Sequence, residues 1–202
     1  MAKRSAPEVN AGSMADIAFL LLIFFLVTTT IETDRGISRK LPPIQDENVE
    51  PPVIKQKNIF TVIVNRNNDL LVEDELMELK DLRKAAMDFL DNGAGSGEDG
   101  CDYCQGAKDP TSSDNPEKAI ISLVNDRKTE YRTYISVQNE LVAAYNMLRN
   151  REARRMYGKD FTEMEANLND PNYKGNKDQL EERVNTIKDM YPQKLSEAEP
   201  KG

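Results

Sequence analysis

Residues 14–31 read MADIAFLLLIFFLVTTTI and form the one long apolar run of the chain. At about 1.5 Å of rise per residue, a helix of this length reaches about 27 Å, close to the roughly 30 Å of a bilayer's hydrocarbon core. The run therefore predicts a helix that crosses a membrane once, with little length to spare for tilt.

Asp16 interrupts this run close to its start. A carboxylate in the middle of a membrane costs on the order of 3 kcal/mol, and less towards either end. One interpretation is a proton-binding site, because burial penalises the charged form of a carboxyl group and lets it bind and release protons. The other is a helix-start residue at the membrane interface, where negative charge suits the helix dipole. The spacing alone leaves both interpretations open.

The composition limits what the rest of the chain can do. It has 202 residues, a net charge of −8, 39% hydrophobic residues and no histidine, which is enough for one membrane anchor and one modest soluble domain. The lack of imidazole excludes Ser-His-Asp and Cys-His pairs and most zinc sites. We therefore expect no enzyme activity, no metal and no cofactor. The acidic balance argues against nucleic acid, whose binding depends on basic contacts to phosphates.

The charges on either side of the apolar run predict its orientation. Lys3 and Arg4 precede the run, whereas Glu32 and Asp34 follow it, so the positive-inside rule places residues 1–13 in the cytoplasm and the remainder outside. The competing interpretation is a cleaved signal peptide, whose apolar core has about 7 to 15 residues and ends at an A-x-A-like site. The run is longer and offers no such site at its end, which favours a retained anchor.

A linker and a small α+β domain follow the membrane helix. Residues 32–58 contain two proline pairs among polar residues, which indicates an extended periplasmic linker. Apolar patterns then predict an α+β domain over residues 59–150, with its hairpin and strands packed on amphipathic helices, and a helical extension over residues 151–202. The expected strands are 59–64, 70–72 and 119–124, with a possible edge strand at 193–197, and the expected helices are 75–91, 131–157 and 180–191.

Residues 92–116 are rich in glycine and read as an insertion in this domain. They contain Cys101 and Cys104 as C-x-x-C, which is typical of a redox pair, half of a zinc site or a local disulfide. A redox pair usually begins a helix after a strand, and a second ligand pair for zinc is missing. If the domain lies outside the cytoplasm, a disulfide that tightens the loop is the favoured outcome.

Asn10 precedes Asp16 by six positions, and an apolar helix containing Leu-Ile-Phe-Phe follows directly. In these residues the chain resembles the ExbD/TolR biopolymer-transport family, and the likeness continues over residues 8–91 and 117–150. Leu41-Pro42 resembles the family's entry into the periplasm.

Two features depart from the family's pattern. Gly12-Ser13 stands where many members carry Thr-Pro, a variant associated with Bacteroidetes-type members. The Cys-bearing insertion and the C-terminal extension lie outside the common pattern, so the resemblance implies nothing about their role.

The resemblance implies an ExbD-like subunit of an inner-membrane motor that is driven by the proton-motive force. Two copies of the membrane helix would lie in the pore of a pentameric ExbB-like partner, with Asp16 in the proton-carrying position. The periplasmic domains would pass work to a TonB-like protein that opens outer-membrane transporters. The polar residues at the helix start or along the pore would be Asn10, Ser13, Thr28, Thr29 and Thr30, although threonine hydroxyls also commonly bond to nearby helix carbonyls.

Other functions remain open from the sequence. A TolR-like or gliding-motor-like subunit would use the same carboxylate but deliver work to another part of the cell envelope. A membrane-tethered periplasmic adaptor would use Asp16 only structurally. The transported nutrient is not encoded here, because in such a system an outer-membrane receptor selects it.

Overall fold

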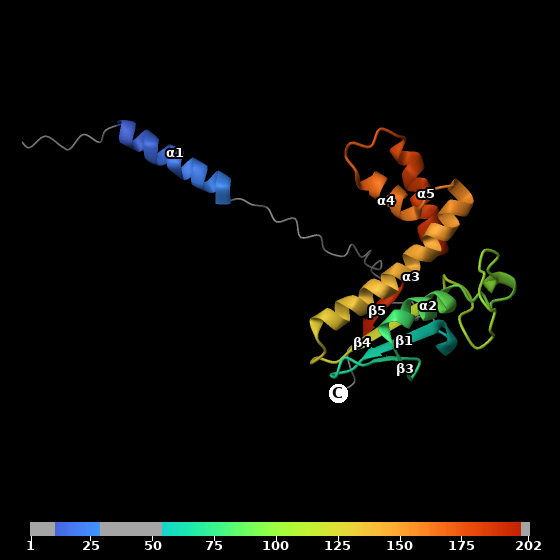
Figure 1. Ribbon diagram of the computed structural model, residues 1–202. Coiled ribbons are helices and arrows are strands. Elements are labelled where there is room, and N and C mark those ends of the chain that lie inside the picture. Colours follow the sequence, from blue (N-terminus) through green and yellow to red (C-terminus); the bar gives the residue numbers. More distant parts are fainter. Residues whose placement is uncertain (1–10, 29–53, 199–202) are drawn as a thin grey trace, which may run out of the picture. The chain divides into compact units, whose positions relative to one another are not determined.

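The computed structural model describes residues 11–28 and 54–198, which fall into two units (Figure 1). The first unit, Met1–Glu50, contains helix α1, Ala11–Thr28. Residues 29–31 of the predicted membrane span, and the predicted linker up to residue 53, lie outside the described residues. Within residues 11–28 and 54–198, no helix is long and apolar enough to cross a membrane.

The second unit, Pro51–Gly202, is a small α+β domain built on one mixed five-stranded sheet. Its strands are β1, Ile59–Val64; β2, Leu70–Val72; β3, Glu75–Met77; β4, Ile120–Asn125; and β5, Leu195–Ala198. Their order is β3-β2-β1-β4-β5, so β1 occupies the centre. The β1–β2 and β2–β3 pairs are antiparallel, whereas β4 runs parallel to both β1 and β5.

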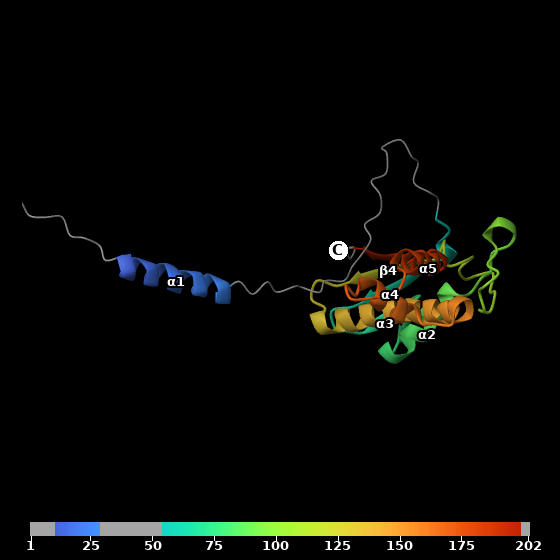
Figure 2. The ribbon, with the colours of Figure 1, turned by 90° about the horizontal axis from the view of Figure 1, so that it is seen from above.

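Two helices, α2 (Leu79–Leu90) and α3 (Tyr131–Tyr157), lie on the same face of this sheet (Figures 1 and 2). Alternate residues of a strand point to opposite faces, so one set of strand side chains packs against these helices and forms the core. The strand residues of this core are Phe60, Val62, Val64, Leu70, Val72, Ile121 and Leu123, and its α2 and α3 residues are Leu82, Ala86, Phe89, Leu90, Val137, Leu141, Ala144, Tyr145 and Leu148.

Two further helices, α4 (Phe161–Asn169) and α5 (Lys177–Met190), pack on each other and on α3. Their apolar cluster consists of Ala153, Phe161, Met164, Leu180, Val184 and Ile187. Gly158 ends α3 with a φ of 68° and donates its N–H to the Arg154 carbonyl, a left-handed cap that favours glycine. Directly after α5, Tyr191 is fully buried in the core below α3 and thereby ties the helical pair to the sheet domain.

The helix predicted over residues 75–91 begins only at Leu79, because the third strand β3 precedes it. Glu73 and Asp74 connect β2 to β3 with φ values of 51° and 67°, the conformation of a two-residue type I′ turn. Such turns usually contain asparagine or glycine, so a Glu-Asp pair gave no sequence signal for this second hairpin.

Residues 151–202, predicted as a helical extension, also supply a strand of the sheet. β5 joins β4 in parallel, and a parallel pair needs a crossover of a dozen or more residues, which the three helices between them provide. α3 runs through residue 150 without a break, and α4 lies between the helices expected over residues 131–157 and 180–191, where the sequence predicts no helix. A nine-residue helix offers too few apolar repeats for a periodic signal.

Candidate functional site

The first candidate site is Asp16 on α1. This residue lies in the second turn of the helix, and its side chain is exposed within the chain itself. At 100° per residue, Gly12, Leu20 and Ile23 project from the same side of α1 as Asp16. The carboxylate therefore stands on a stripe made of small and apolar residues.

Apart from Asp16, the large side chains of α1 are apolar. Large hydrophobic residues that point in every direction are exposed, and their exposed fractions range from 39% at Ile23 to 62% at Phe19 and Phe25. A helix that is hydrophobic all round needs an apolar environment on every side, as in a membrane or a large core. Within its own unit, the described residues 11–28 supply no such environment around this helix.

The structure places only part of the predicted polar set. Ser13 and Thr28 belong to α1, whereas Asn10, Thr29 and Thr30 lie outside the described residues. Thr28 is twelve residues from Asp16, which corresponds to about 18 Å along the helix and about 120° around it. All residues between them are apolar, so α1 alone offers no polar path from one to the other.

The second candidate site is the point where the chain enters the domain, just before β1. Asp114, in the insertion, holds this entry through a cluster with Lys55, Lys57 and Asn58, here called the Asp114 cluster. An Asp114 carboxylate oxygen lies 2.5 Å from the Lys57 Nζ, and the other accepts bonds from Lys55 Nζ at 3.2 Å and Asn58 Nδ2 at 3.1 Å. The Asp114 backbone N–H donates to Asn58 Oδ1 at 2.8 Å.

The Asp114 carboxylate is only 5% exposed, which makes its pairing necessary. The hydrogen bond from Lys57, with further help from Asn58 and Lys55, lowers the pKa of Asp114 to about 2 in spite of its burial. The carboxylate is therefore charged throughout the physiological range, and the insertion is fastened to residues 55–58 by a charged contact that is buried on its Asp114 side.

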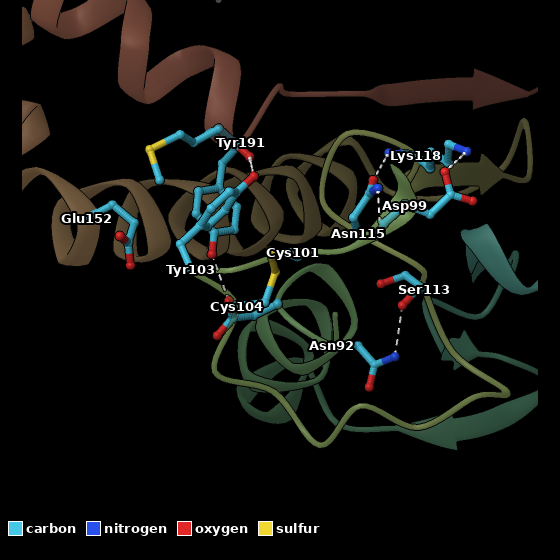
Figure 3. Close-up of a disulfide and its surroundings, with 12 residues drawn as sticks. Asn92, Asp99, Cys101, Tyr103, Cys104, Ser113, Asn115, Lys118, Glu152 and Tyr191 are labelled. Carbon is cyan, nitrogen blue, oxygen red and sulfur yellow. Dashed lines mark hydrogen bonds and ion pairs between the residues drawn. A yellow bond between two sulfur atoms is a disulfide. The ribbon is translucent and has the colours of Figure 1, made fainter. Parts of the chain in front are cut away.

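The insertion is equally well anchored to the end of α2. The Asn92 side-chain amide donates to the Ser113 carbonyl oxygen at 2.8 Å (Figure 3). It also donates to the Asp109 carbonyl oxygen at 2.9 Å, and its oxygen accepts from the Asp109 N–H. The Ser113 hydroxyl donates to the Phe89 carbonyl. These bonds hold both ends of the insertion, at Asn92 and at Asp109 and Ser113, against the end of α2.

A disulfide joins Cys101 to Cys104, and both residues are buried (Figure 3). It packs closely on Gly93, where a Cβ atom would lie 2.7 Å from the Cys104 Cβ. Gly93 also has a φ of 66°, so two independent requirements favour glycine there.

Tyr103, between the two cysteines, connects the insertion to the C-terminal helices. Its hydroxyl donates to the Met190 carbonyl at 2.7 Å, and its ring meets the Tyr191 ring edge-on at 5.4 Å between centroids. Burial, with nearby carboxylates, raises the pKa of Tyr103 to about 12, so the hydroxyl stays protonated and able to donate.

A buried polar network lies beneath this contact. The Asp91 carboxylate accepts two bonds from Arg151, at 2.5 and 2.8 Å, and one from the Tyr191 hydroxyl at 2.6 Å. These bonds to Asp91 raise the pKa of Arg151. Glu152 is fully buried between Arg151 (3.0 Å) and Arg155 (2.6 Å). Together these charges join α2, α3 and the residue after α5 into one unit.

The sequence singles out Asp16 and the cysteines but does not indicate the Asp114 cluster or the Asp91 network. Asp114 and Asn58 are 56 residues apart, and Asp91 and Tyr191 are 100 apart. No local spacing marks such pairs. A weak signal existed for the first, because the entry to β1 carries two lysines beside an asparagine and the insertion is rich in aspartate.

No group of three or more histidine, cysteine, aspartate or glutamate side chains is arranged to hold a metal ion within the described residues. The charged groups of the Asp114 cluster are instead paired with one another, and so are those of the Asp91 network. These contacts attach segments of the domain to one another.

The chain matches the family described as biopolymer transport protein ExbD/TolR over residues 2–149. The chain belongs to this family. No curated protein matches it. The ExbD/TolR match includes α1, the sheet through β4 and most of α3, and it ends before α4 and β5. Membership in the ExbD/TolR family supports a general role as an energy-transducing subunit in biopolymer transport.

Proposed function

We propose that this protein is a non-enzymatic subunit of a proton-driven motor in the bacterial inner membrane. Residues 14–31 would cross the membrane once, with residues 1–13 in the cytoplasm and the α+β domain in the periplasm. The observation that carries the proposal is an exposed carboxylate, Asp16, on a helix whose exposed large side chains are otherwise apolar on every side. Membership in the ExbD/TolR family supports it independently.

Asp16 would bind and release the protons that cross the membrane. A lone charge facing lipid is costly, but the cost falls where a protein pore surrounds the helix. Two copies of the helix inside a pentameric ExbB-like partner would provide this environment, and the partner would also supply the polar path that α1 lacks. One charge that crosses about 100 mV releases about 2.3 kcal/mol, so several protons per cycle suffice to remodel a protein contact.

The domain would deliver this work to a TonB-like protein that opens outer-membrane transporters. The Asp114 cluster supports this part of the proposal, because it fastens the segment that comes from the membrane directly to the insertion and to the start of β1. A movement of α1 would thus reach the domain at a defined attachment point. The motor needs no cofactor in this scheme.

Asp16→Asn tests the proton role. We expect this variant to lose energy-dependent uptake, whereas Asp16→Glu keeps part of it, because only the second retains a group that can exchange protons. Membrane insertion and co-purification with the ExbB-like partner should be unchanged in both variants. Normal uptake by Asp16→Asn would leave an adaptor role, with a structural Asp16, as the better account.

A further inference from the structure

Helices α2 and α3 lie side by side and leave a groove between them on the surface of the domain (Figure 2). The groove encloses about 550 Å³. It is separate from α1, from the Asp114 cluster and from the Asp91 network. We call it the α2–α3 groove. Its lining residues are Lys80, Arg83, Lys84 and Met87 of α2 and Glu140 and Met147 of α3.

The charges of α2 are sorted by side. At 100° per residue, Lys80, Arg83 and Lys84 lie within an arc of about 100° that faces the groove. Asp81 and Asp88 project in a mean direction about 100° further round the helix. The groove is therefore lined by three cations and one carboxylate, although the chain as a whole carries a net charge of −8.

Two of these cations are free to meet a partner. Arg83 is not, because it forms a bidentate pair with Glu140 at 2.8 and 3.0 Å, which ties α2 to α3 beside the groove. The Lys80 Nζ lies 2.6 Å from a Glu78 oxygen, but both side chains are more than 70% exposed, so water screens this pair. Lys84 is exposed and has no ion-pair partner within the described residues.

Two methionines supply the apolar part of the groove. Met147 is 47% exposed, whereas Met87 is half-buried and packs against the core. Methionine is unbranched and flexible, so it adapts to the shape of a bound surface. The aliphatic stems of the two lysines extend this apolar area. The groove thus combines an apolar floor with positive charge beside it.

The geometry of the groove favours a helix as its occupant. The backbone groups of α2 and α3 are paired within their own helices, so they offer no hydrogen bonds to an extended segment. A helix pairs its own backbone and packs against a neighbouring helix at 8–10 Å between axes. From Lys80 to Met87 the groove runs for about 10 Å, or two turns, which fits apolar anchors at positions i, i+4 and i+7.

We propose that the α2–α3 groove docks an acidic amphipathic helix of another protein. The apolar side of this helix would contact Met87 and Met147, and carboxylates beside it would meet Lys80 and Lys84. A surface of anionic lipid fits less well, because lipid binding of this kind uses clusters of about four to eight basic residues. The inference goes beyond the proposed motor and does not depend on the proton role of Asp16.

The test uses the full-length chain in phosphatidylcholine nanodiscs and a fluorescent, stapled helical peptide of about 18 residues as the probe. The peptide carries leucine at i, i+4 and i+7 and glutamate on either side of this row. A second peptide has lysine in place of every glutamate. We expect fluorescence anisotropy to show about tenfold tighter binding of the glutamate peptide, because only its charges complement the groove. Empty nanodiscs give the baseline.

A charge reversal in the groove should exchange these preferences. Lys84→Glu lies at an exposed position of α2, and the matched control Lys174→Glu lies at an exposed position between α4 and α5. We expect Lys84→Glu to weaken binding of the glutamate peptide about tenfold and to strengthen binding of the lysine peptide. The second effect is a gain, which misfolding does not produce. Lys174→Glu should change neither affinity.

Met147→Gln tests the apolar floor without changing a charge. The position is exposed and glutamine is a good helix former, so the variant should unfold at the same temperature as the unchanged chain. Binding of the glutamate peptide should weaken several-fold, because the leucine row loses an apolar contact. An unchanged affinity would mean that the peptide is held by charge alone and would overturn the docking of an amphipathic helix.

The remaining outcomes identify other occupants. Equal affinity for the two peptides, or equal effects of Lys84→Glu and Lys174→Glu, would overturn the inference. The same holds if phosphatidylglycerol vesicles, or a second copy of the chain, bind through Lys84 in place of the peptide. Asp16→Asn separates this inference from the proposed function, since it should abolish uptake but leave peptide binding unchanged.

Discussion

Asp114 is the residue through which the insertion holds the segment before β1. Its carboxylate is buried and meets two lysines and an asparagine from the segment before β1. Removing one partner from such a contact leaves the remaining buried polar groups without a hydrogen bond. The resulting loss of stability therefore exceeds the contribution of any single bond.

Asp114→Ala should lower the free energy of unfolding by about 2 to 4 kcal/mol, because Lys57 and Asn58 lose a buried charged partner. Urea unfolding of the full-length chain in detergent, followed by circular dichroism, measures this value. The matched control is Asp102→Ala at an exposed position of the same insertion, where a change within about 0.5 kcal/mol is expected. Equal effects of the two substitutions would contradict the role given to Asp114.

The contribution of the Asp114 charge should also depend on pH. The pKa of Asp114 is about 2 in the folded chain and lies near 3.9 in an unfolded one, so the charge stabilises the fold above about pH 4. That stabilisation is lost as the pH falls through 2, where the group is protonated in both states. The stability difference between the unchanged chain and Asp114→Asn should therefore be largest above pH 4 and shrink towards pH 2. A constant difference across this range would argue against a charge effect.

At the scale of elements, the disulfide and Tyr103 join the insertion to the end of α5. The four-residue loop closed by Cys101 and Cys104 presents Tyr103 to the Met190 carbonyl. The insertion consequently contacts both the entry to β1 and the C-terminal helices, two parts of the domain that are distant in sequence.

Replacing both cysteines by serine should cost about 2 kcal/mol of unfolding free energy, the loop-closure value for so short a ring. Tyr103→Phe should cost about 1 kcal/mol through loss of its hydrogen bond. If the disulfide works by positioning Tyr103, the triple variant should lose less than the sum of the two effects. Thermal unfolding of each variant measures this, and strict additivity would show that the two features act independently.

Local patterns predicted several elements well because their cause is local. The apolar alternation of residues 59–64 and the long amphipathic repeat of residues 131–157 correspond to β1 and α3. The β2–β3 turn and α4 escaped prediction, since one uses residues that are unusual for its φ angles and the other is short. Asp16 stood out because it breaks a uniform run, whereas Asp114 looks like any loop aspartate until folding brings Lys57 to it.

At the scale of the whole molecule, the ExbD/TolR match stops at residue 149 but the folded domain does not. Residues beyond it supply β5, α4 and α5, together with the Arg151 and Tyr191 partners of Asp91. Tyr191 is fully buried in the main core, so these residues complete the domain.

A chain that ends at residue 149 should therefore fail to fold cooperatively, because it loses an entire strand and exposes Tyr145 and Leu148. A chain that ends at residue 198 should melt like the full-length protein. Proteolysis and thermal unfolding of the two truncations in the same detergent give the comparison. A cooperative transition in the shorter chain would show that residues 150–198 form an accessory layer.

The position of β1 determines how the domain carries load. This strand is the central one, it follows directly on residues 54–58, and it pairs along six positions with β4 and along three with β2. A force applied to residues 54–58 along the direction of β1 would therefore shear all these hydrogen-bonded pairs together. A force applied to an edge strand would instead separate its pairs one by one. In the proposed motor, a domain held in this way would resist tension applied through residues 54–58, and the outer strands β3 and β5 should detach from the sheet before β1 does.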